Sequence, residues 1–306
     1  METINYPGHT TSMLGYLSYP DDFNSSAGQK QCWRKDTTVN ASSNKYLASE
    51  AVAAGAAIPV NRFTPHDDPN YNEGFANRRS LIINNDAPGR FSFIAPFSHI
   101  FGFAEYEKVL YNLQHILKFR READTLAIHR ANGVADGKIV LHDIKWIMPK
   151  VTPSTYMRMK LLEDVKNRTV IPVTFSSRND QYAIVPHGVR NYQTMFNKSA
   201  GVEKPRWIIV GFQTNKDRNQ EQNPAVFDHM GLTDAVVQLN ADRYPSNSRS
   251  INFAENDYVD FYEMADDFKK EYYQINNLIG GTQIDMVNFK KLFPIIVFDV
   301  RHQSEM

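Results

Sequence analysis

The stretch that decides the fold is NPAVFDHMGLTDAVVQLNADRYPSNS, residues 223–248. Within it, Val237 and Leu239 alternate with Gln238 and Asn240. This period of two is typical of a half-buried β-strand. Asp242 and the turn-forming residues 245–248 are expected to end that strand, with Arg243-Tyr244-Pro245 at its edge. No catalytic motif lies here, so the role of this strand depends on the rest of the chain.

Similar short apolar or alternating runs, separated by turn formers, fill most of the chain after residue 80. The runs that predict strands are 80–84, 90–98, 125–130, 137–151, 170–175, 181–186, 191–196, 206–212 and 294–300. Residues 105–121 fit either a helix or a strand. Before residue 80 the chain is rich in turn formers, which indicates a long ordered loop or a flexible excursion.

Only a few helices are expected. One begins at Thr152-Pro153 and places Tyr156, Met159, Leu162 and Val165 at helical spacing. A second, Tyr258 to Tyr272, carries an aromatic stripe, and a short one is expected within 47–57. Many strands broken by two clear helices predict a mainly antiparallel β protein, a sandwich or a jelly roll.

Composition narrows the function classes. The 306 residues include 34 Lys plus Arg and 34 Asp plus Glu, so the net charge is zero and gives no strong signal for nucleic-acid binding. Cys32 is the only cysteine, which excludes an intrachain disulfide and favours a reducing compartment. The N-terminus does not look like a signal peptide, and no apolar run is long enough to span a membrane. We therefore expect an intracellular protein that is not secreted.

Two motifs suggest ligand binding at first sight. Gly133-Val134-Ala135-Asp136-Gly137-Lys138-Ile139 resembles a phosphate-binding loop, but it has one residue too few between its glycines and precedes a strand, so a hairpin turn is favoured. His66-Asp67-Asp68 offers metal-ligand types, but neighbours in sequence rarely converge on one ion, so a solvated turn is favoured.

Three further candidates also favour structural roles. His142 shares a strand face with Ile144 and Trp146, which favours a hydrogen-bonded interior histidine over a catalytic base. Cys32 precedes Trp33-Arg34-Lys35, whose cations could lower its pKa, but no catalytic base is identified for it. Glu263 and Asp266-Asp267 lie opposite the aromatic stripe, which predicts a solvated helix face. We therefore assign no catalytic, cofactor-binding or metal-binding residue.

Five blocks in order carry a resemblance to a known family. They are GKIVLHDIKWIMPKVTPS, VEKPRWIIVGFQT, NPAVFDHMGLTDAVVQLNADRYP, YVDFYEMADDF and FPIIVFDVRHQSE. Together they resemble the double jelly-roll, hexon-like major capsid proteins of Polinton/Maverick elements and related viruses, whose cellular copies are labelled double jelly-roll-like domain proteins. A weaker match covers YPGHTTSMLGYLSYPDDFNSSAGQKQCWRKDTT, and the likeness of 90–103 and 112–121 to paired strands favours an extended segment there.

The resemblance implies an all-β double jelly roll, with residues 1–135 as the C-terminal part of a first jelly roll and 136–306 as a second one. It also implies a double jelly roll incomplete at both ends, in a fragment or an endogenous copy of a capsid gene. Its function would be to form trimeric pseudo-hexagonal capsomers, with copies of itself, neighbouring capsomers and minor capsid or penton proteins as partners. It implies no enzymatic activity and no cofactor.

The expected positions of individual side chains follow from this fold. Sheet cores are expected to contain Trp146, Trp207, Ile208, Val210, Phe212, Val237, Leu239, Ile296 and Phe298. The stripe of Tyr258, Phe261, Tyr262, Phe268 and Tyr272 is expected to cover a sheet or meet a neighbouring subunit. Two alternatives stay open: a host-adapted jelly roll that binds a small ligand or sugar, and a metal-dependent cupin-type enzyme, for which the histidines lack H-x-H spacing.

Overall fold

A computed structural model describes residues 2–42, 71–83, 89–110, 113–170, 172–196, 204–247, 251–275 and 281–303. The expected helix within 47–57 and the His66-Asp67-Asp68 turn lie outside these residues. The α-helices are α1 (Pro7–Ser18), α2 (Glu73–Ile82), α3 (Thr155–Lys166), α4 (Val259–Tyr273) and α5 (Met286–Lys291). The strands are β1 (Trp207–Val210), β2 (Val237–Leu239), β3 (Asp242–Tyr244) and β4 (Ile296–Asp299). Short 3₁₀ helices are η1 (Asp21–Ser25), η2 (Ala27–Gln31), η4 (Phe97–His99), η5 (Gly102–Glu105) and η6 (Asp124–Leu126).

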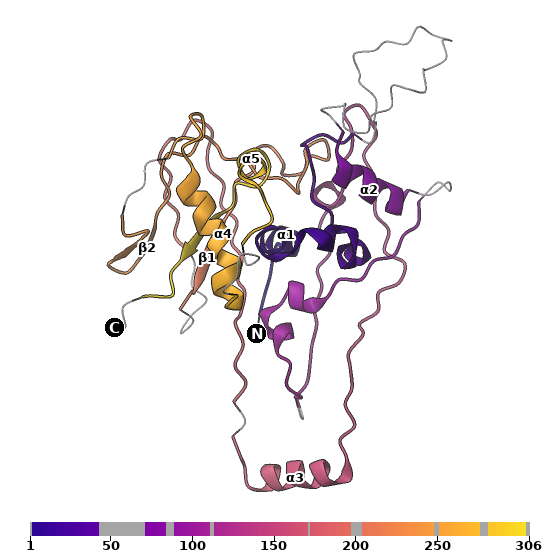
Figure 1. Ribbon diagram of the computed structural model, residues 1–306. Helices are drawn as coiled ribbons and strands as arrows, with labels where there is room; N and C mark the ends of the chain where they lie inside the picture. The colour runs from indigo at the N-terminus through magenta and orange to yellow at the C-terminus, as the bar shows by residue number, and fades with distance from the viewer. Residues whose placement is uncertain are drawn as a thin grey trace.

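The core lies where α4 covers an antiparallel pair formed by β1 and β4. Trp207 pairs with Asp299 and Val210 with Ile296, and the Trp207 ring meets Phe268 of α4 edge-on at 5.1 Å between ring centroids. Helical spacing places Phe261, Ala265 and Phe268 on one face of α4, and all three are buried. Figure 1 shows α4 running across β1. The strands predicted at 206–212 and 294–300 and the second helix are therefore confirmed.

The β2–β3 pair is a tight hairpin in the segment quoted at the outset. Leu239 pairs with Asp242, and Asn240 between them has a φ of 55°, in the left-handed region that Asn tolerates better than most residues. The strand predicted at Val237 to Leu239 is confirmed. Its expected end is wrong in one respect, because Asp242 begins a second strand that contains Arg243 and Tyr244.

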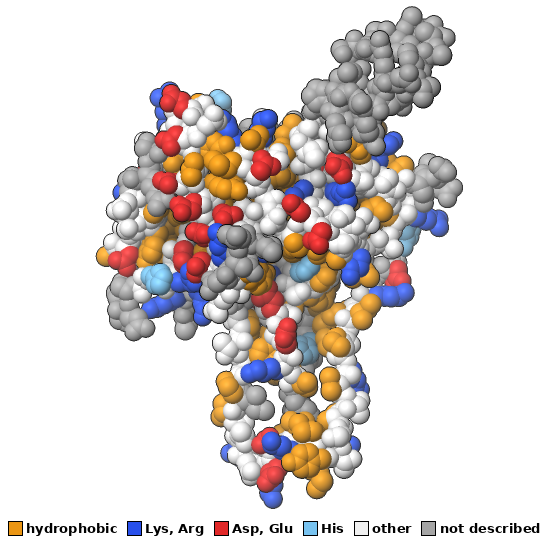
Figure 2. Space-filling model, in the orientation of Figure 1, with side chains coloured by type: hydrophobic (Ala, Val, Ile, Leu, Met, Phe, Trp, Pro, Cys, Tyr) orange, Lys and Arg blue, Asp and Glu red, His pale blue; other side chains and the backbone are white. Residues whose placement is uncertain are grey.

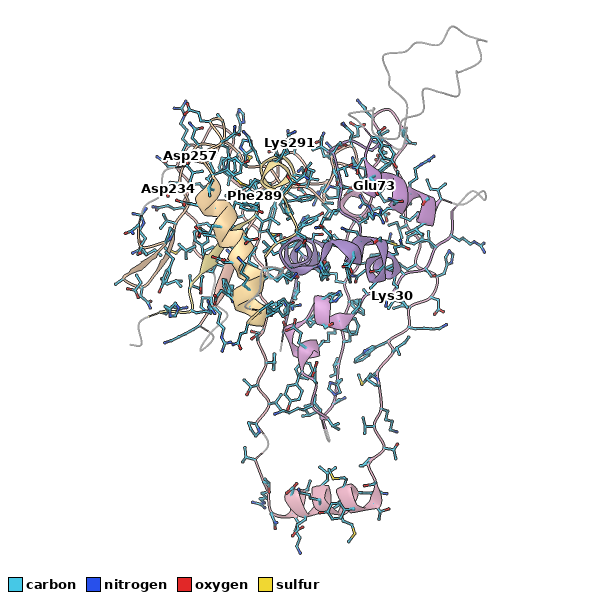
Figure 3. The ribbon with its side chains drawn as sticks, viewed as in Figure 1. Lys30, Glu73, Asp234, Asp257, Phe289 and Lys291 are labelled. Carbon is cyan, nitrogen blue, oxygen red and sulfur yellow. The ribbon has the colours of Figure 1, made fainter. Side chains whose placement is uncertain are left out.

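Helix α1 joins the N-terminal segment to the core, and the sequence patterns did not predict it. Its Tyr16 is buried with its ring 4.1 Å from that of Phe293, and the Tyr16 hydroxyl donates to the Ala225 carbonyl at 2.8 Å. Gly15 is required at the same contact, since a Cβ there would stand 2.5 Å from the Trp33 ring. Figure 3 labels Phe289 of α5, another buried ring of this core.

The all-β expectation is not confirmed. Within the described residues, both sheets have only two strands, and helices hold more of the chain than strands do. Residues 80–82 end helix α2 instead of starting a strand, and no strand forms at 90–98, 125–130, 137–151, 172–175, 181–186 or 191–196. Residues 113–121 form no helix, in agreement with the extended reading. A strand needs a ladder of backbone hydrogen bonds to a neighbour, and among the described residues these segments form only isolated ones, such as that from the Ile94 N–H to the Lys30 carbonyl at 2.7 Å.

Helix α3 confirms the expected helix but not its start. Ser154 caps it, accepting a hydrogen bond from the Met157 N–H at 3.4 Å, so Thr152 and Pro153 precede the cap. Trp146 does not lie in a sheet core, because 44% of it is exposed. In Figure 1, α3 lies far from the other elements, at the end of two long extended segments. The division at residue 135 stays a prediction.

Candidate functional site

The most distinctive surface is the projection formed by residues 138–170 and 172–175, which we call the arm. Gly137 anchors its start, because the Gly137 N–H donates to Gln220 Oε1 at 2.8 Å while Gln220 Nε2 donates to the Gly137 carbonyl at 3.0 Å. The chain then runs out to α3 and returns, and every residue from 140 to 160 is exposed. At the returning end, Phe175 meets Phe103 edge-on at 5.1 Å between centroids.

The arm is apolar as well as exposed. Val140 is 69% exposed, Ile144 66% and Ile147 82%, and on α3 Tyr156 is 76% exposed. Figure 2 shows hydrophobic side chains gathered along this projection. Among its charges, Lys145 pairs with Asp143 at 2.9 Å on the surface. An apolar projection of this kind is typical of a binding surface, because single exposed apolar residues are ordinary whereas contiguous ones are not.

A second feature is a buried polar network around Asp36, whose side chain is fully buried. Its carboxylate accepts from Arg78 of α2 at 2.5 Å and from Asn223 Nδ2 at 2.6 Å. Gly74 allows this approach, since a Cβ there would stand 2.4 Å from Asp36 Oδ1. The network joins three segments that are distant in sequence. It therefore holds together the N-terminal segment, α2 and the loop that contains Asn223.

His129 lies beside this network. Burial lowers the pKa of His129 to about 4; the Asp36 carboxylate opposes this and the Arg78 guanidinium reinforces it. Its Nδ1 is buried without a hydrogen-bond partner, as are Trp33 Nε1 and Thr125 Oγ1. The imidazole is therefore neutral at pH 7 and packs against Phe75, with 5.5 Å between the ring centroids. These properties describe a packed histidine.

A small cavity of about 240 Å³ lies next to the network and is lined by Cys32, Trp33, Arg34 and Arg78, among others. Both arginines already have partners: Arg34 pairs with Glu73 at 2.7 Å, and Arg78 pairs with Asp36. Figure 3 labels Glu73 at the start of α2. Burial raises the pKa of the Cys32 thiol, which the Arg78 cation opposes only in part. The cavity is smaller than the roughly 300–1,000 Å³ of ordinary ligand pockets.

The structure places the sequence candidates apart from one another. Residues 132–134 form a turn with Gly133 at a φ of 76°, but no hairpin, since no strands flank it. Arg130 ties this loop down through Asp136 at 2.7 Å and Glu221 at 2.9 Å. His142 is exposed on the arm, so its predicted interior position is wrong: the strand face that would have buried it has no sheet beneath it.

The acidic face of α4 agrees in part with its prediction. Glu263 and Asp267 are exposed, as expected. Asp266 is half-buried: it pairs with Lys270 at 2.8 Å and accepts from the Thr282 N–H at 2.8 Å. Asp266 therefore anchors the segment that leads to β4. Among the residues that the structure describes, no group of three His, Cys, Asp or Glu side chains could hold a metal ion.

Sequence reasoning missed the Asp36 network altogether. Arg78 and Asn223 lie 42 and 187 positions from Asp36 along the chain, so no local motif could reveal the network. Asn72 was also missed, although it leaves a local signal. It caps α2 by accepting from the Phe75 N–H at 3.1 Å, and an Asn followed by Glu73 is typical of a helix start.

Comparison with known proteins gives one result. A family model of the double jelly roll-like domain matches residues 69–306, which is more than three quarters of the chain and includes the arm, α4 and all four strands. The chain therefore belongs to the double jelly roll-like domain family. Neither a search of curated proteins nor a search of solved structures gave a match. No described helix has the length and apolar character needed to cross a membrane.

Proposed function

We propose that this chain is a capsid-type structural subunit that assembles with copies of itself and has no catalytic activity and no cofactor. The observation that carries the proposal is the arm, whose apolar side chains are exposed over more than twenty consecutive residues. An apolar surface of this size on a folded chain marks a site that another molecule covers in the assembled state. Membership in the double jelly roll-like domain family supports a capsid-type subunit over other self-assembling classes.

The finer parts of the proposal follow from the resemblance of five sequence blocks to hexon-like capsid proteins of Polinton/Maverick elements. The assembly would be a trimeric, pseudo-hexagonal capsomer that contacts neighbouring capsomers and minor capsid or penton proteins. The chain would then be found in a virion, or inside the cell if it is an endogenous copy. The single cysteine is compatible with an intracellular site, because disulfides play no part in the fold.

The rival function is a binding module that recognises a small ligand or sugar. A candidate site for it among the described residues is the 240 Å³ cavity beside Cys32 and Trp33. The cavity is small, and the arginines at its wall are already paired. The arm offers far more apolar surface than this cavity, so assembly is the function that the surface supports best.

Light scattering of the purified protein over a concentration series tests the proposal. We expect a molar mass that rises with concentration and reaches a plateau at a closed multiple of 35.1 kDa, with three copies as the expected number. A folded monomer at every concentration would overturn self-assembly. In that case, a sugar or small molecule that raises Tm would support the binding module.

A further inference from the structure

The outgoing part of the arm is extended but has no hydrogen-bonded neighbour. Between residues 140 and 153, no backbone group bonds to another described residue, and no side chain in that range is buried. Ordering the backbone costs about 1–2 kcal/mol for each residue that is fixed. The arm recovers little of this cost from its own chain, so contacts with another molecule would stabilise its extended form.

The amount of apolar surface indicates what kind of contact that is. If a fully exposed large apolar side chain presents roughly 120–150 Å², the exposed fractions along the arm add up to about 1,000–1,300 Å². The largest apolar patch on an ordinary monomer is about 300–600 Å². A stable interface buries about 800 Å² on each partner. The outgoing segment, α3 and the returning segment together therefore have enough apolar surface for a stable complex, and residues 139–148 contribute less than half of it.

The body of the same chain offers a matching acceptor. Within the described residues, β1 pairs with β4 and with no other strand, so one edge of β1 is open. The Val300 N–H donates to the Arg206 carbonyl at 3.0 Å, and hydrogen-bonded pairs alternate along an antiparallel ladder. The backbone N–H and C=O groups of Trp207 and Ile209 therefore point away from β4, toward the open edge.

Burial agrees with β1 being the outer strand of this sheet. All four residues of β1 are half-buried, whereas Ile296, Val297 and Phe298 of β4 are buried. An open edge of this kind accepts an added strand readily. The alternating run 139–148 is suited to be that strand, because Val140, Ile144 and Trp146 share one of its faces.

We propose that residues 139–148 of one copy add as a strand to the open edge of β1 in a second copy. This inference rests on the proposed self-assembly and names the two surfaces that make it. The arm cannot reach β1 of its own chain in this conformation: Figure 1 shows the outgoing segment on the α2 side of the molecule, well away from β1. Because donor and acceptor are different surfaces of one chain, two copies can exchange arms reciprocally, or successive copies can join head to tail and close into a ring when the rotation allows.

Charged substitutions with a matched control test the arm. Ile144→Asp places a carboxylate on the docking face, and Val287→Asp places one on α5 at a position of similar exposure, 56% against 66%. A charge carried into an apolar interface is costly, so Ile144→Asp is expected to weaken association at least about tenfold in light scattering. Val287→Asp is expected to assemble like the wild type. Circular dichroism confirms that both variants fold.

A second pair of variants tests the acceptor edge. Ile209→Pro removes the N–H that points toward the open edge and leaves the β1–β4 bonds in place, whereas Ile209→Val keeps it. Only the proline variant is expected to lose assembly. If Ile209→Pro does not fold, cross-linking still decides. Two chains that both carry Cys32→Ser are mixed, one with Ile209→Cys and the other with Val140→Cys, His142→Cys, Ile144→Cys or Trp146→Cys. A dimer on a non-reducing gel that requires both chains supports the contact.

The outcomes separate this inference from the proposed function. Loss of assembly in Ile144→Asp and Ile209→Pro, with both controls intact, supports strand addition. A wild type that assembles while Ile144→Asp assembles equally well, without cross-links to Ile209→Cys, overturns strand addition and leaves self-assembly standing. A wild type that is monomeric at every concentration overturns both.

Discussion

At the scale of single residues, the three tryptophans show how environment decides what a side chain does. Trp207 lies between Phe268 of α4 and the Arg301 guanidinium, whose carbon is 4.7 Å from the ring centroid. Trp146 stands on the arm with 44% of its surface exposed, and its ring approaches that of Phe97 at 6.0 Å. The Trp33 ring packs against Gly15 and against the ring of Tyr16. The same residue type therefore serves the core, an open surface and a helix contact.

The first prediction compares two of these tryptophans. Trp207→Ala is expected to lower the free energy of unfolding by about 2 kcal/mol, less than the roughly 3–5 kcal/mol of a fully buried aromatic, because Trp207 is half-buried. Trp146→Ala is expected to change it by less than about 0.5 kcal/mol in the dilute, unassembled chain. Urea unfolding of both variants measures the difference. Equal losses in the two would contradict the placement of either ring.

The second prediction concerns pH. The pKa of His129 is about 4 in the folded chain, against an ordinary 6.5, so the unfolded chain binds the proton more tightly. The contribution of neutral His129 is complete above about pH 6.5 and is lost as the pH falls toward 4. His129→Asn removes this titration. Between pH 7 and pH 5, urea midpoints of the wild type are expected to fall further than those of His129→Asn, and parallel curves would refute the assignment.

At the scale of elements, sequence reasoning succeeded where local pattern and tertiary contact agree. The runs around Trp207 and Ile296 are strands because they pair with each other, and α4 is a helix because its aromatic stripe has this sheet to cover. The runs around Val140 and Ile184 have the same alternating pattern, but among the described residues they pair with no other strand. An alternating apolar–polar pattern indicates that a segment is suited to a sheet, but it does not indicate whether a partner strand is present.

The missed helices have a different explanation. Helix α1 contains Gly8 and Gly15 and has a weak apolar face, so its pattern is not helical; it is held by Tyr16 and Leu17 in the core. In α2, the apolar run at Leu81-Ile82 looks like a strand start, but the Asn72 cap and the bond from Arg78 to Asp36 hold the segment as a helix. Tertiary contacts override local preference in both cases.

The third prediction belongs to the β2–β3 hairpin. Asn240 has a φ of 55°, which a β-branched side chain adopts only with strain. Asn240→Val is expected to cost about 1–2 kcal/mol, while Asn240→Gly changes stability by no more than a few tenths. Thermal unfolding of the two variants measures this. If valine were tolerated as well as glycine, the two-residue turn would be misplaced.

At the scale of the whole molecule, the chain divides into a body that buries its own apolar side chains and an arm whose apolar side chains are exposed. In the body, Tyr16 of α1 packs against Phe293 before β4, so the two ends of the chain share one core. In the arm, residues 140–160 are exposed without a break. The family match spans both, and sequence patterns predicted the apolar surface of the arm but placed it inside a sheet.

The fourth prediction follows from this division and uses limited trypsin digestion at two protein concentrations. In dilute solution, the first cuts among the described residues are expected at Lys145 or Lys150, since an extended, exposed backbone fits a protease without prior unfolding. The two fragments should remain associated after the cut, because α1 and β4, which lie on opposite sides of the arm in the sequence, meet in one core.

At concentrations where the protein assembles, cutting at these sites should slow at least about tenfold, since a bound partner competes with the protease for the arm. Val287→Asp should show the same protection as the wild type, and Ile144→Asp should lose it. Cleavage at these two sites that is equally fast at both concentrations, in a protein that light scattering shows to be assembled, would mean that the arm stays open in the assembly and that another surface holds the copies together.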